Sequence, residues 1–308
     1  MGYLDAGQKE LWLTAAKVAA VLPKRKRNSH KGDYGKAAIV AGSLAYTGAA
    51  YLSAAACLRS GAGYTTLFVP SGILPYYILK SPEILLKSSN EGTVYAFNEE
   101  IMGQVCEYNA VAYGMGMGVS QEVADGAAYL LRCYFGKLIL DADGLNSLAA
   151  YKKSELAHLL KNAKCDVVLT PHIKEFSRIT GLSVEEILSA DLQNAQAFAN
   201  ENSVTILLKN AATIVTDGAK TAVNFTGNSG QAKGGSGDVL SGVIAGLCAQ
   251  GASGFDGACA GVFLCGKAAE IAVETLGEYS LTASDCIEKL GKAFLFVAEH
   301  THNDGGNE

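Results

Sequence analysis

Residues 231–242 read QAKGGSGDVLSG and hold four glycines and one aspartate directly before an apolar run. The helical spacing of the apolar residues that follow predicts a helix beginning near Ser236. The first turn of a helix leaves backbone N–H groups unpaired, and the aligned peptide dipoles add partial positive charge there. Gly234, Gly235 and Gly237 carry no side chain that would keep an anion away from these donors. The segment therefore predicts a phosphate-binding loop.

Asp238 lies among these donors, where a carboxylate can have either of two roles. It can stabilise the helix through its dipole. It can instead act as a general base that takes a proton from a hydroxyl group attacking a phosphate. The segment lacks the Lys-Ser/Thr ending of a Walker A loop, and it does not open a βαβ unit as a dinucleotide-binding fingerprint does. These residues alone leave both roles of Asp238 open.

The elements that must position this loop alternate between short apolar strands and helices. Strands are predicted over 37–42, 64–69, 110–114, 137–141, 166–170, 204–209, 213–216 and 222–225, the last two as a hairpin around an Asp-Gly turn. Helices are predicted over 48–61, 184–202 and 255–275. Continuous apolar strands are typical of a mostly parallel sheet buried on both faces. The pattern predicts an α/β fold with a doubly wound central sheet and helices on both faces.

No proline- or serine-rich linker divides the 308 residues, so a single domain over 1–308 is expected. Residues 1–28 are predicted to form an N-terminal extension whose apolar helix, QKELWLTAAKVAAVL, suits an oligomer interface. The polar residues 300–308 are predicted to be a frayed tail.

Charge and composition exclude several classes of protein. The net charge is −5, so no overall basic field exists to hold nucleic acid, and the short basic run 24–27 is interpreted as a solvated loop. No apolar run reaches the length of a membrane span, and the N-terminus lacks the pattern of a signal peptide. The eight cysteines include no CxxC pair, which favours reduced core residues and a cytoplasmic location.

Six ordered blocks carry a resemblance to a known family. They are SHKGDYGKAAIVAGSLAYTGAAYLSAAACLRSGAGYTTL (29–67), YGMGMG (113–118), DADGLN (141–146), LTPHIKEFSRITG (169–181), LLKNAAT (207–213) and GNSGQAKGGSGDVLSG (227–242). In this order they resemble the ADP- or ATP-dependent NAD(P)H-hydrate dehydratases, a branch of the ribokinase-like superfamily. The resemblance covers nearly the whole chain after about residue 22, and we expect the dehydratase activity alone, without the epimerase domain that is fused to some members.

The resemblance implies repair of a damaged cofactor. The hydroxyl group of the S-epimer of hydrated NADH or NADPH would be phosphorylated by ADP or ATP in the presence of Mg²⁺, and loss of phosphate would then restore the ring double bond. Asp238 would be the catalytic base, and the N–H groups around Gly235, Ser236 and Gly237 would stabilise the transferring phosphoryl group. This role would explain why a single carboxylate lies at the start of the helix.

Further site residues follow from the same resemblance. Nucleotide binding is implied for Gly237 and for the segment Lys209, Asn210, Ala211, Ala212 and Thr213. Asn210 stands where the family usually has glycine, and asparagine tolerates the positive φ of such a turn better than most residues. Without the resemblance, Lys209 would be interpreted as an ordinary lysine at a strand end.

The substrate pocket is implied at Ala49, Gly116, His172 and Asp238. Glu175 would order Mg²⁺ and its waters near the phosphates. Met115 replaces a proline that is usual in the family, and Ser236 replaces a commoner threonine but keeps the hydroxyl group.

The sequence leaves the role of one acidic pair open and predicts one contact between subunits. Asp141 and Asp143 follow a predicted strand, where they are either helix caps or ligands of a cation and the ribose. The block HKGDYG is expected to extend toward a neighbouring subunit of a homotetramer.

Two other functions compete with the dehydratase. A kinase of a small alcohol such as a thiamin precursor would use the same loop and base, although His172 stands where such kinases have asparagine. A non-catalytic nucleotide-binding protein would be expected to lack Asp238 or the loop glycines, which are present.

Overall fold

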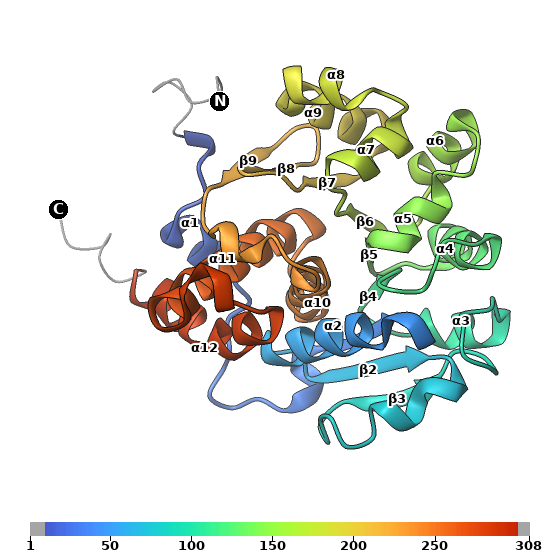
Figure 1. The fold of residues 1–308 in the computed structure, drawn as a ribbon, viewed down its shortest axis with the longest axis horizontal. Coiled ribbons are helices and arrows are strands. Elements are labelled where there is room, and N and C mark those ends of the chain that lie inside the picture. Colours follow the sequence, from blue (N-terminus) through green and yellow to red (C-terminus); the bar gives the residue numbers. More distant parts are fainter. Residues whose placement is uncertain (1–9, 301–308) are drawn as a thin grey trace.

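The computed structural model describes residues 10–300, which form a nine-stranded sheet between two layers of helices (Figure 1). The strands are β1 (Lys36–Val40), β2 (Tyr64–Val69), β3 (Leu85–Ser88), β4 (Ala110–Tyr113), β5 (Lys137–Leu140), β6 (Asp166–Leu169), β7 (Thr205–Leu208), β8 (Thr213–Thr216) and β9 (Thr221–Asn224). Their spatial order is β3-β2-β1-β4-β5-β6-β7-β8-β9, parallel as far as β7 and antiparallel beyond it. The predicted doubly wound α/β fold is confirmed, and so is the hairpin formed by β8 and β9.

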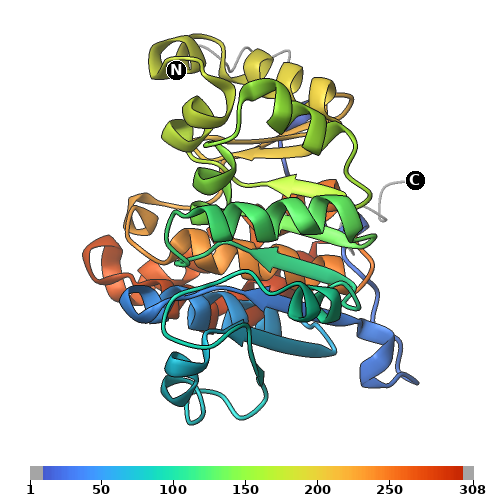
Figure 2. The same cartoon turned by 90° about the vertical axis from the view of Figure 1, so that its right-hand side faces the viewer.

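The helices cover both faces of the sheet. One layer holds α1 (Ala15–Val21), α2 (Thr47–Arg59), α10 (Ser236–Ala249), α11 (Gly254–Ser280) and α12 (Ala283–Glu299). The other holds α3 (Glu99–Val105), α4 (Gln121–Cys133), α5 (Ala142–Leu148), α6 (Lys153–Lys161), α7 (Ile173–Thr180), α8 (Val184–Ser189) and α9 (Asp191–Asn202). Figure 2 views the molecule from this second side, with α4 and α6 in front of the strands. Short 3₁₀ turns lie at η2 (Lys31–Tyr34), η3 (Leu44–Tyr46), η4 (Ser71–Tyr76) and η5 (Ser229–Gln231).

Three predictions about the elements were wrong. Within the described residues, the N-terminal helix is limited to α1, because Thr14 caps it and Trp12 forms a β-bridge with Val223. The predicted helix over 184–202 is two helices, α8 and α9, since Ala190 has the non-helical angles φ −151° and ψ 49°. Strand β3 was missed because it is an edge strand, paired only with β2, whose side chains are not fully buried.

The predictions for the two ends of the chain, for the cysteines and for membrane spans have mixed outcomes. Helix α1 packs Ala15 and Val18 into the core of its own chain, so those side chains are not free for an oligomer interface. Residues 1–9 of the predicted extension, and 301–308 of the predicted tail, lie outside the described residues. All eight cysteines are free thiols, as predicted, and five of them are buried. Within residues 10–300, no helix is long and apolar enough to cross a membrane.

The sheet has a topological switch point between β1 and β4. From β1 the chain proceeds outward through β2 and β3, and from β4 it proceeds the other way through β5, β6 and β7. Loops leaving two adjacent parallel strands in opposite directions open a crevice at the carboxyl ends of those strands. The Gly42 amide after β1 donates to the Met115 carbonyl after β4 at 2.8 Å, which joins the two loops there.

Helices α2 and α10 approach each other closely, and this contact places the predicted phosphate loop at the switch point. A Cβ atom on Gly242 would lie 2.0 Å from the Ser53 carbonyl oxygen, and one on Gly246 would lie 2.7 Å from the Cys57 carbonyl oxygen. The Ser53 hydroxyl donates to the Asp238 carbonyl oxygen at 2.8 Å. Small residues on α10 therefore set the distance at which Asp238 is held over the sheet.

Gly242→Ala is expected to destabilise the protein by about 3 kcal/mol, because the clashing atom belongs to the backbone and cannot move aside. Gly291→Ala is the matched control: Gly291 is an exposed helical glycine with open space around its Cβ position. That change should stabilise the protein by about 0.5–1 kcal/mol through helix propensity. Denaturant unfolding of both variants tests this, and equal stability of the two would refute the close-packing argument.

Candidate active site

Helix α10 begins where the sequence predicted, directly after the glycines of the predicted phosphate loop. Gly235 is the N-cap residue with φ +98°, a left-handed conformation that favours glycine, and α10 starts at Ser236. The Ser236 hydroxyl donates to the Gln231 carbonyl at 2.8 Å, and the Lys233 ammonium donates to the Leu281 carbonyl at 2.7 Å. These hydrogen bonds connect the loop to the preceding 3₁₀ turn and to the segment before α12. The first backbone N–H groups of α10 remain available for an anion.

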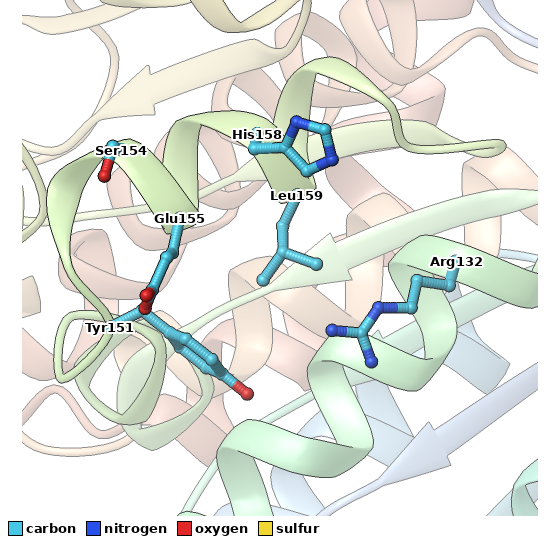
Figure 3. Close-up of a pocket in the computed structure, with 6 residues that line it drawn as sticks. All are labelled: Arg132, Tyr151, Ser154, Glu155, His158 and Leu159. Atoms are coloured by element: carbon cyan, nitrogen blue, oxygen red, sulfur yellow. The ribbon is translucent and has the colours of Figure 1, made fainter.

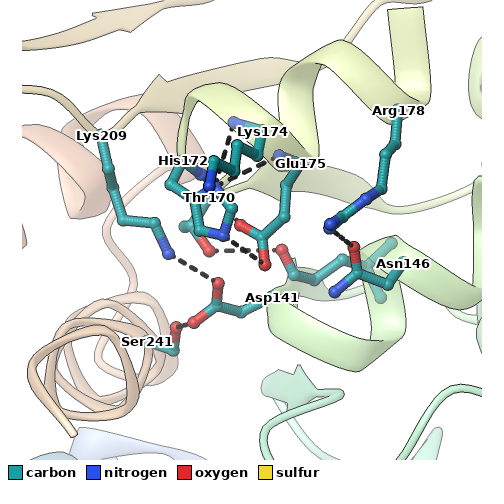
Figure 4. Close-up of polar contacts among 10 residues, drawn as sticks. Asp141, Asn146, Thr170, His172, Lys174, Glu175, Arg178, Lys209 and Ser241 are labelled. Atoms are coloured by element: carbon teal, nitrogen blue, oxygen red, sulfur yellow. Dashed lines mark hydrogen bonds and ion pairs between the residues drawn. The ribbon is translucent and has the colours of Figure 1, made fainter. Parts of the chain in front are cut away.

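A buried polar cluster lies beside this loop, at the carboxyl ends of β5, β6 and β7 (Figure 4). The Lys209 ammonium lies 2.9 Å from Oδ1 of Asp141, and the Ser241 hydroxyl donates to Oδ2 of Asp141 at 2.6 Å. A Cβ on Gly237 would lie 3.5 Å from Nζ of Lys209 and 3.7 Å from Oδ2 of Asp141. The phosphate loop therefore lies directly against the Lys209–Asp141 pair, which places the ammonium group within reach of a phosphate bound there.

Asp238 titrates near neutral pH. Burial raises the pKa of Asp238 to about 7; the nearby Asp141 and Asp143 carboxylates also raise it, and Lys209 opposes them. A carboxyl group with this pKa is present in both protonation states under physiological conditions. It can accept a proton and release it again, as a general base must.

The two partners beneath the loop are both charged. Burial lowers the pKa of Lys209, but the carboxylates of Asp141 and Glu175 outweigh burial and leave it raised. Burial likewise raises the pKa of Asp141, but Lys209 and Ser241 outweigh burial and leave it lowered. The Lys209 ammonium therefore stays positively charged beside the loop, paired with an ionised carboxylate.

His172 and Glu175 form the capping box of α7. Nδ1 of His172 accepts from the backbone N–H of Glu175 at 3.2 Å, and Oε2 of Glu175 accepts from the backbone N–H of His172 at 2.9 Å. Burial lowers the pKa of His172, and the positive charges of Lys209 and Arg178 lower it further, so the imidazole is neutral at pH 7. His172 is half exposed and forms a β-bridge with Lys209, so it borders the polar cluster.

Asn210 does not adopt the positive φ that was expected of it, so that explanation of the turn between β7 and β8 was wrong. Instead, Oδ1 of Asn210 accepts from the Ala211 amide at 2.9 Å, and the Thr213 hydroxyl donates to the Asn210 carbonyl at 3.4 Å. The side chain thus supplies what a glycine would supply through backbone freedom. The segment from Lys209 through Ala212 to Thr213 lies at the same edge of the sheet as the cluster.

The two predicted substrate residues on the other side of the site lie together. Gly116 has φ +65°, and a Cβ there would lie 2.9 Å from the Cβ of Ala49 and 2.7 Å from that of Tyr46. The Ser43 hydroxyl donates to the Gly116 carbonyl at 2.9 Å. Ala49 lies one helical turn before Ser53 on α2, and Ser53 in turn holds the backbone of Asp238. The surface formed by Ala49 and Gly116 is thus connected to the backbone of Asp238 through one turn of helix.

For the acidic pair after β5, the structure tests the helix-cap alternative alone. Asp141 occupies the N-cap position of α5, but its side chain makes no hydrogen bond to the helix backbone, so its carboxylate does not cap the helix. Asp143 accepts from the Gly118 amide at 2.8 Å and fixes the glycine loop after β4. The Asn146 side chain accepts from Arg178 at 2.7 Å, which joins α5 to α7.

Two surface cavities lie elsewhere. The cavity in Figure 3, about 430 Å³, lies between α4 and α6 and is lined by Arg132, Tyr151 and His158 among others. Another of about 690 Å³ is lined by Arg59 of α2 and Glu288 of α12, among others. Neither contains a residue of the polar cluster, so the candidate active site is identified by its convergent polar groups and not by cavity volume.

Sequence reasoning missed Ser241 and left the role of Asp141 open. Ser241 follows Asp238 by three residues, so helical spacing alone places both on one face of α10. No comparable signal connects Asp141 with Lys209, because 68 residues separate them.

Comparison with known proteins agrees with this geometry. The family model of the NAD(P)H-hydrate dehydratases matches residues 37–292. An ADP-dependent (S)-NAD(P)H-hydrate dehydratase of Neisseria meningitidis is 32% identical over 273 residues, which cover 88% of each chain. A bifunctional NAD(P)H-hydrate repair enzyme of Thermofilum pendens is 36% identical over 283 residues, which cover 90% of this chain and 53% of that one. The chain thus spans about half the length of its bifunctional relatives.

Solved structures show the same fold. The ADP/ATP-dependent NAD(P)H-hydrate dehydratase of Bacillus subtilis, co-crystallised with ATP and Mg²⁺, superposes with a TM-score of 0.79 at 28% identity, over 93% of this chain and 98% of that one. A hydroxyethylthiazole kinase of Pyrococcus horikoshii superposes with a TM-score of 0.59 at 15% identity, over 90% and 92% of the two chains, which shows a shared ribokinase-like fold alone. The sequence blocks, the fold and these relatives agree that the chain belongs to the NAD(P)H-hydrate dehydratase family.

Proposed function

We propose that this protein is a nucleotide-dependent dehydratase that converts the S-epimer of hydrated NADH or NADPH back to the intact cofactor, with ADP or ATP as the phosphoryl donor. The observation that carries the proposal is the position of Asp238. A carboxyl group with a pKa of about 7 lies at the start of α10, in the phosphate loop, and Ser53 connects it to the surface formed by Ala49 and Gly116. A hydroxyl group held on that surface would lie between a base and a phosphate site.

The first step transfers a phosphoryl group. Asp238 takes the proton of the substrate hydroxyl group, whose oxygen forms a bond to the terminal phosphorus of the nucleotide while the bond from phosphorus to the bridging oxygen breaks. The leaving group is AMP when ADP is the donor and ADP when ATP is the donor. The Lys209 ammonium and the N–H groups at Gly235, Ser236 and Gly237 stabilise the negative charge of the transferring group.

The second step is an elimination. The bond from carbon to the phosphorylated oxygen breaks and inorganic phosphate leaves, while the neighbouring ring carbon loses a proton to solvent and the electrons of that C–H bond restore the double bond. His172, neutral at pH 7, borders this space and supports binding of the substrate ring. The segment from Asn210 to Thr213 is proposed to contact the nucleotide at the end of β7.

The charges of the site fit a divalent cation. Asp141, Glu175 and Asp238 all raise the pKa of Lys209, so three carboxyl groups face a single ammonium group. Within residues 10–300, no three His, Cys, Asp or Glu side chains form a metal site by themselves. Mg²⁺ commonly binds through substrate phosphates and water, with few protein ligands. Glu175, which is 5% exposed, would hold such a cation through water, and the cation would offset the charge of the phosphates.

We further propose that the protein acts as a homotetramer in the cytoplasm, and that it binds neither nucleic acid nor membrane. The net charge of −5 supports the absence of nucleic-acid binding, and the free thiols support the cytoplasmic location. The block HKGDYG forms η2 at the amino-terminal edge of the sheet, away from the polar cluster of its own chain. This position suits contact with a neighbouring subunit.

The decisive experiment follows absorbance of the reduced nicotinamide ring with NADH hydrate, Mg²⁺ and either ADP or ATP. Recovery of absorbance that requires a nucleotide is the expected result, and the faster nucleotide identifies the donor. Chromatography of the products distinguishes the alternative: a small-alcohol kinase leaves a stable phosphate ester and restores no absorbance. A folded protein that binds nucleotide but restores no absorbance with either donor would refute the proposed function.

A further inference from the structure

Asp141 is buried, charged and directed away from the helix that it begins. It is 1% exposed, and its side chain makes no capping bond to α5. The next residue, Ala142, has φ +47°, which is uncommon for a residue with a Cβ and costs free energy. Ala142 and Ser203 are the non-glycine residues with positive φ in the described part of the chain. The backbone is thus strained at the place where it turns this carboxylate toward the phosphate loop.

The two oxygens of Asp141 have different partners. Oδ1 accepts from the Lys209 ammonium at 2.9 Å, and Oδ2 accepts from the Ser241 hydroxyl at 2.6 Å. Ser241 lies on α10, three residues after Asp238. One carboxylate therefore joins the ammonium group at the end of β7 to the helix that carries the base.

This link lies against the loop. The Cβ position of Gly237 is 3.5 Å from the Lys209 ammonium and 3.7 Å from Asp141. Lysine is a flexible point charge, and an ammonium group without a fixed partner samples many rotamers. Pairing with a buried carboxylate removes that freedom before any nucleotide binds.

We propose that Asp141 is a positioning residue for phosphoryl transfer, which holds the Lys209 ammonium beneath the phosphate loop and, through Ser241, fixes that ammonium relative to Asp238. The inference rests on the proposed function for the identity of the reaction. It goes beyond that function by assigning to Asp141 a role in nucleotide binding and in the ionisation of the base.

The second role follows from the charges that face Asp238. These are Asp141 after β5, Asp143 on α5 and Lys209 after β7. Asp141 and Asp143 favour the protonated base and Lys209 favours the ionised base. Loss of the charge of Asp141 should therefore make Asp238 ionise at lower pH.

The test compares Asp141→Asn, which removes the charge at constant size, with Ser241→Ala, which removes one hydrogen bond and keeps the charge. Asp141→Asn should weaken binding of ADP or ATP by about tenfold, as expected for a lost charge-assisted hydrogen bond. It should also move the acid limb of the kcat/KM profile down by about one pH unit. Ser241→Ala should lower kcat and leave the acid limb in place. Thermal unfolding of both variants measures any purely structural effect.

If Asp141→Asn leaves Lys209 buried without a partner and does not fold, a double-mutant cycle that also removes the Lys209 charge still tests the proposal. Lys209→Met and the double variant Asp141→Asn/Lys209→Met should bind nucleotide equally weakly, since Asp141 acts through Lys209. Weaker binding by the double variant than by Lys209→Met would overturn the proposal. So would a folded Asp141→Asn protein with unchanged nucleotide affinity and an unchanged acid limb.

Nucleotide affinity is measured by calorimetry in the absence of hydrate, so it tests Asp141 independently of the substrate. A wild-type protein that restores no absorbance from NADH hydrate would contradict the proposed function alone. A wild-type protein that restores it, together with an Asp141→Asn variant indistinguishable from it in both readouts, would contradict this inference alone.

Discussion

Asp238→Asn is expected to lower kcat of the nucleotide-dependent reaction by about 1000-fold, because asparagine cannot take the proton of the substrate hydroxyl group. Nucleotide affinity should stay within a few fold, since the loop N–H groups and Lys209 are untouched. Single-turnover kinetics with NADH hydrate, together with calorimetry of ADP binding, separate the two effects. Activity of the variant within tenfold of wild type would exclude Asp238 as the base.

The same group is expected to set the pH dependence of the wild-type reaction. The base must be ionised, and burial, which is the first cause of its shift, raises the pKa of Asp238 to about 7. We therefore expect kcat/KM to fall tenfold per pH unit below about pH 7 and to level off above it. A profile that stays flat down to pH 5 would contradict this assignment. The Asp238→Asn variant is the control, because its residual activity should lack this limb.

Asp238→Asn should also stabilise the protein at alkaline pH. The pKa of Asp238 is raised from 3.8 in an unperturbed aspartate to about 7 in the folded protein. The protonated Asp238 therefore contributes its full stabilisation of the folded state below about pH 3.8, and this contribution is lost as the pH rises through about 7. Above that pH the neutral variant avoids the loss, and we expect a gain of about 4 kcal/mol that vanishes near pH 4. Denaturant unfolding at both pH values measures it, and a gain of equal size at both would refute the linkage.

Gly237→Ala is expected to lower kcat/KM by about 100-fold without unfolding the protein. The added methyl group has room in the fold, since the nearest atoms, Nζ of Lys209 and Oδ2 of Asp141, are 3.5 and 3.7 Å away. It would, however, point at the ammonium group that a phosphate must approach, and displacement of a reacting group by about 1 Å costs about 100-fold in rate.

The control for Gly237→Ala is its own stability. Alanine is the better helix former at this second position of α10, so the thermal unfolding temperature should not fall. A large loss of both stability and activity would mean that the loop backbone had moved. Full activity in a stable variant would show that phosphate does not approach Lys209 past Gly237.

Local features of the chain were predictable. The start of α10 at Ser236 follows from glycines that precede helical apolar spacing, and the hairpin of β8 and β9 follows from its Asp-Gly turn. Continuous apolar strands predicted the mostly parallel sheet. These properties depend on neighbours in sequence, through dihedral preferences and side-chain periodicity.

Elements with weak local signals were not predictable in the same way. Strand β3 is held by pairing with β2 alone, and the division between α8 and α9 occurs at Ala190, a residue with good helix propensity. Asn210 was expected to adopt positive φ, but its side chain stabilises the turn instead. In each case, tertiary contacts or a local hydrogen bond override propensity.

The sequence predicted the glycine loop and Asp238 as candidate site residues from their pattern, and Lys209 from the family resemblance. Only the tertiary structure decided how they act together. Asp141 is 68 residues from Lys209 and 100 residues from Ser241 along the chain. Asp141 and Lys209 meet because the parallel strands β5 and β7 end at one edge of the sheet, and helix α10 brings Ser241 to them. The pKa of Asp238 is likewise set by burial and by charges from other elements. Local sequence encodes dihedral preference and periodicity, whereas burial and charge pairing arise only when distant segments pack together.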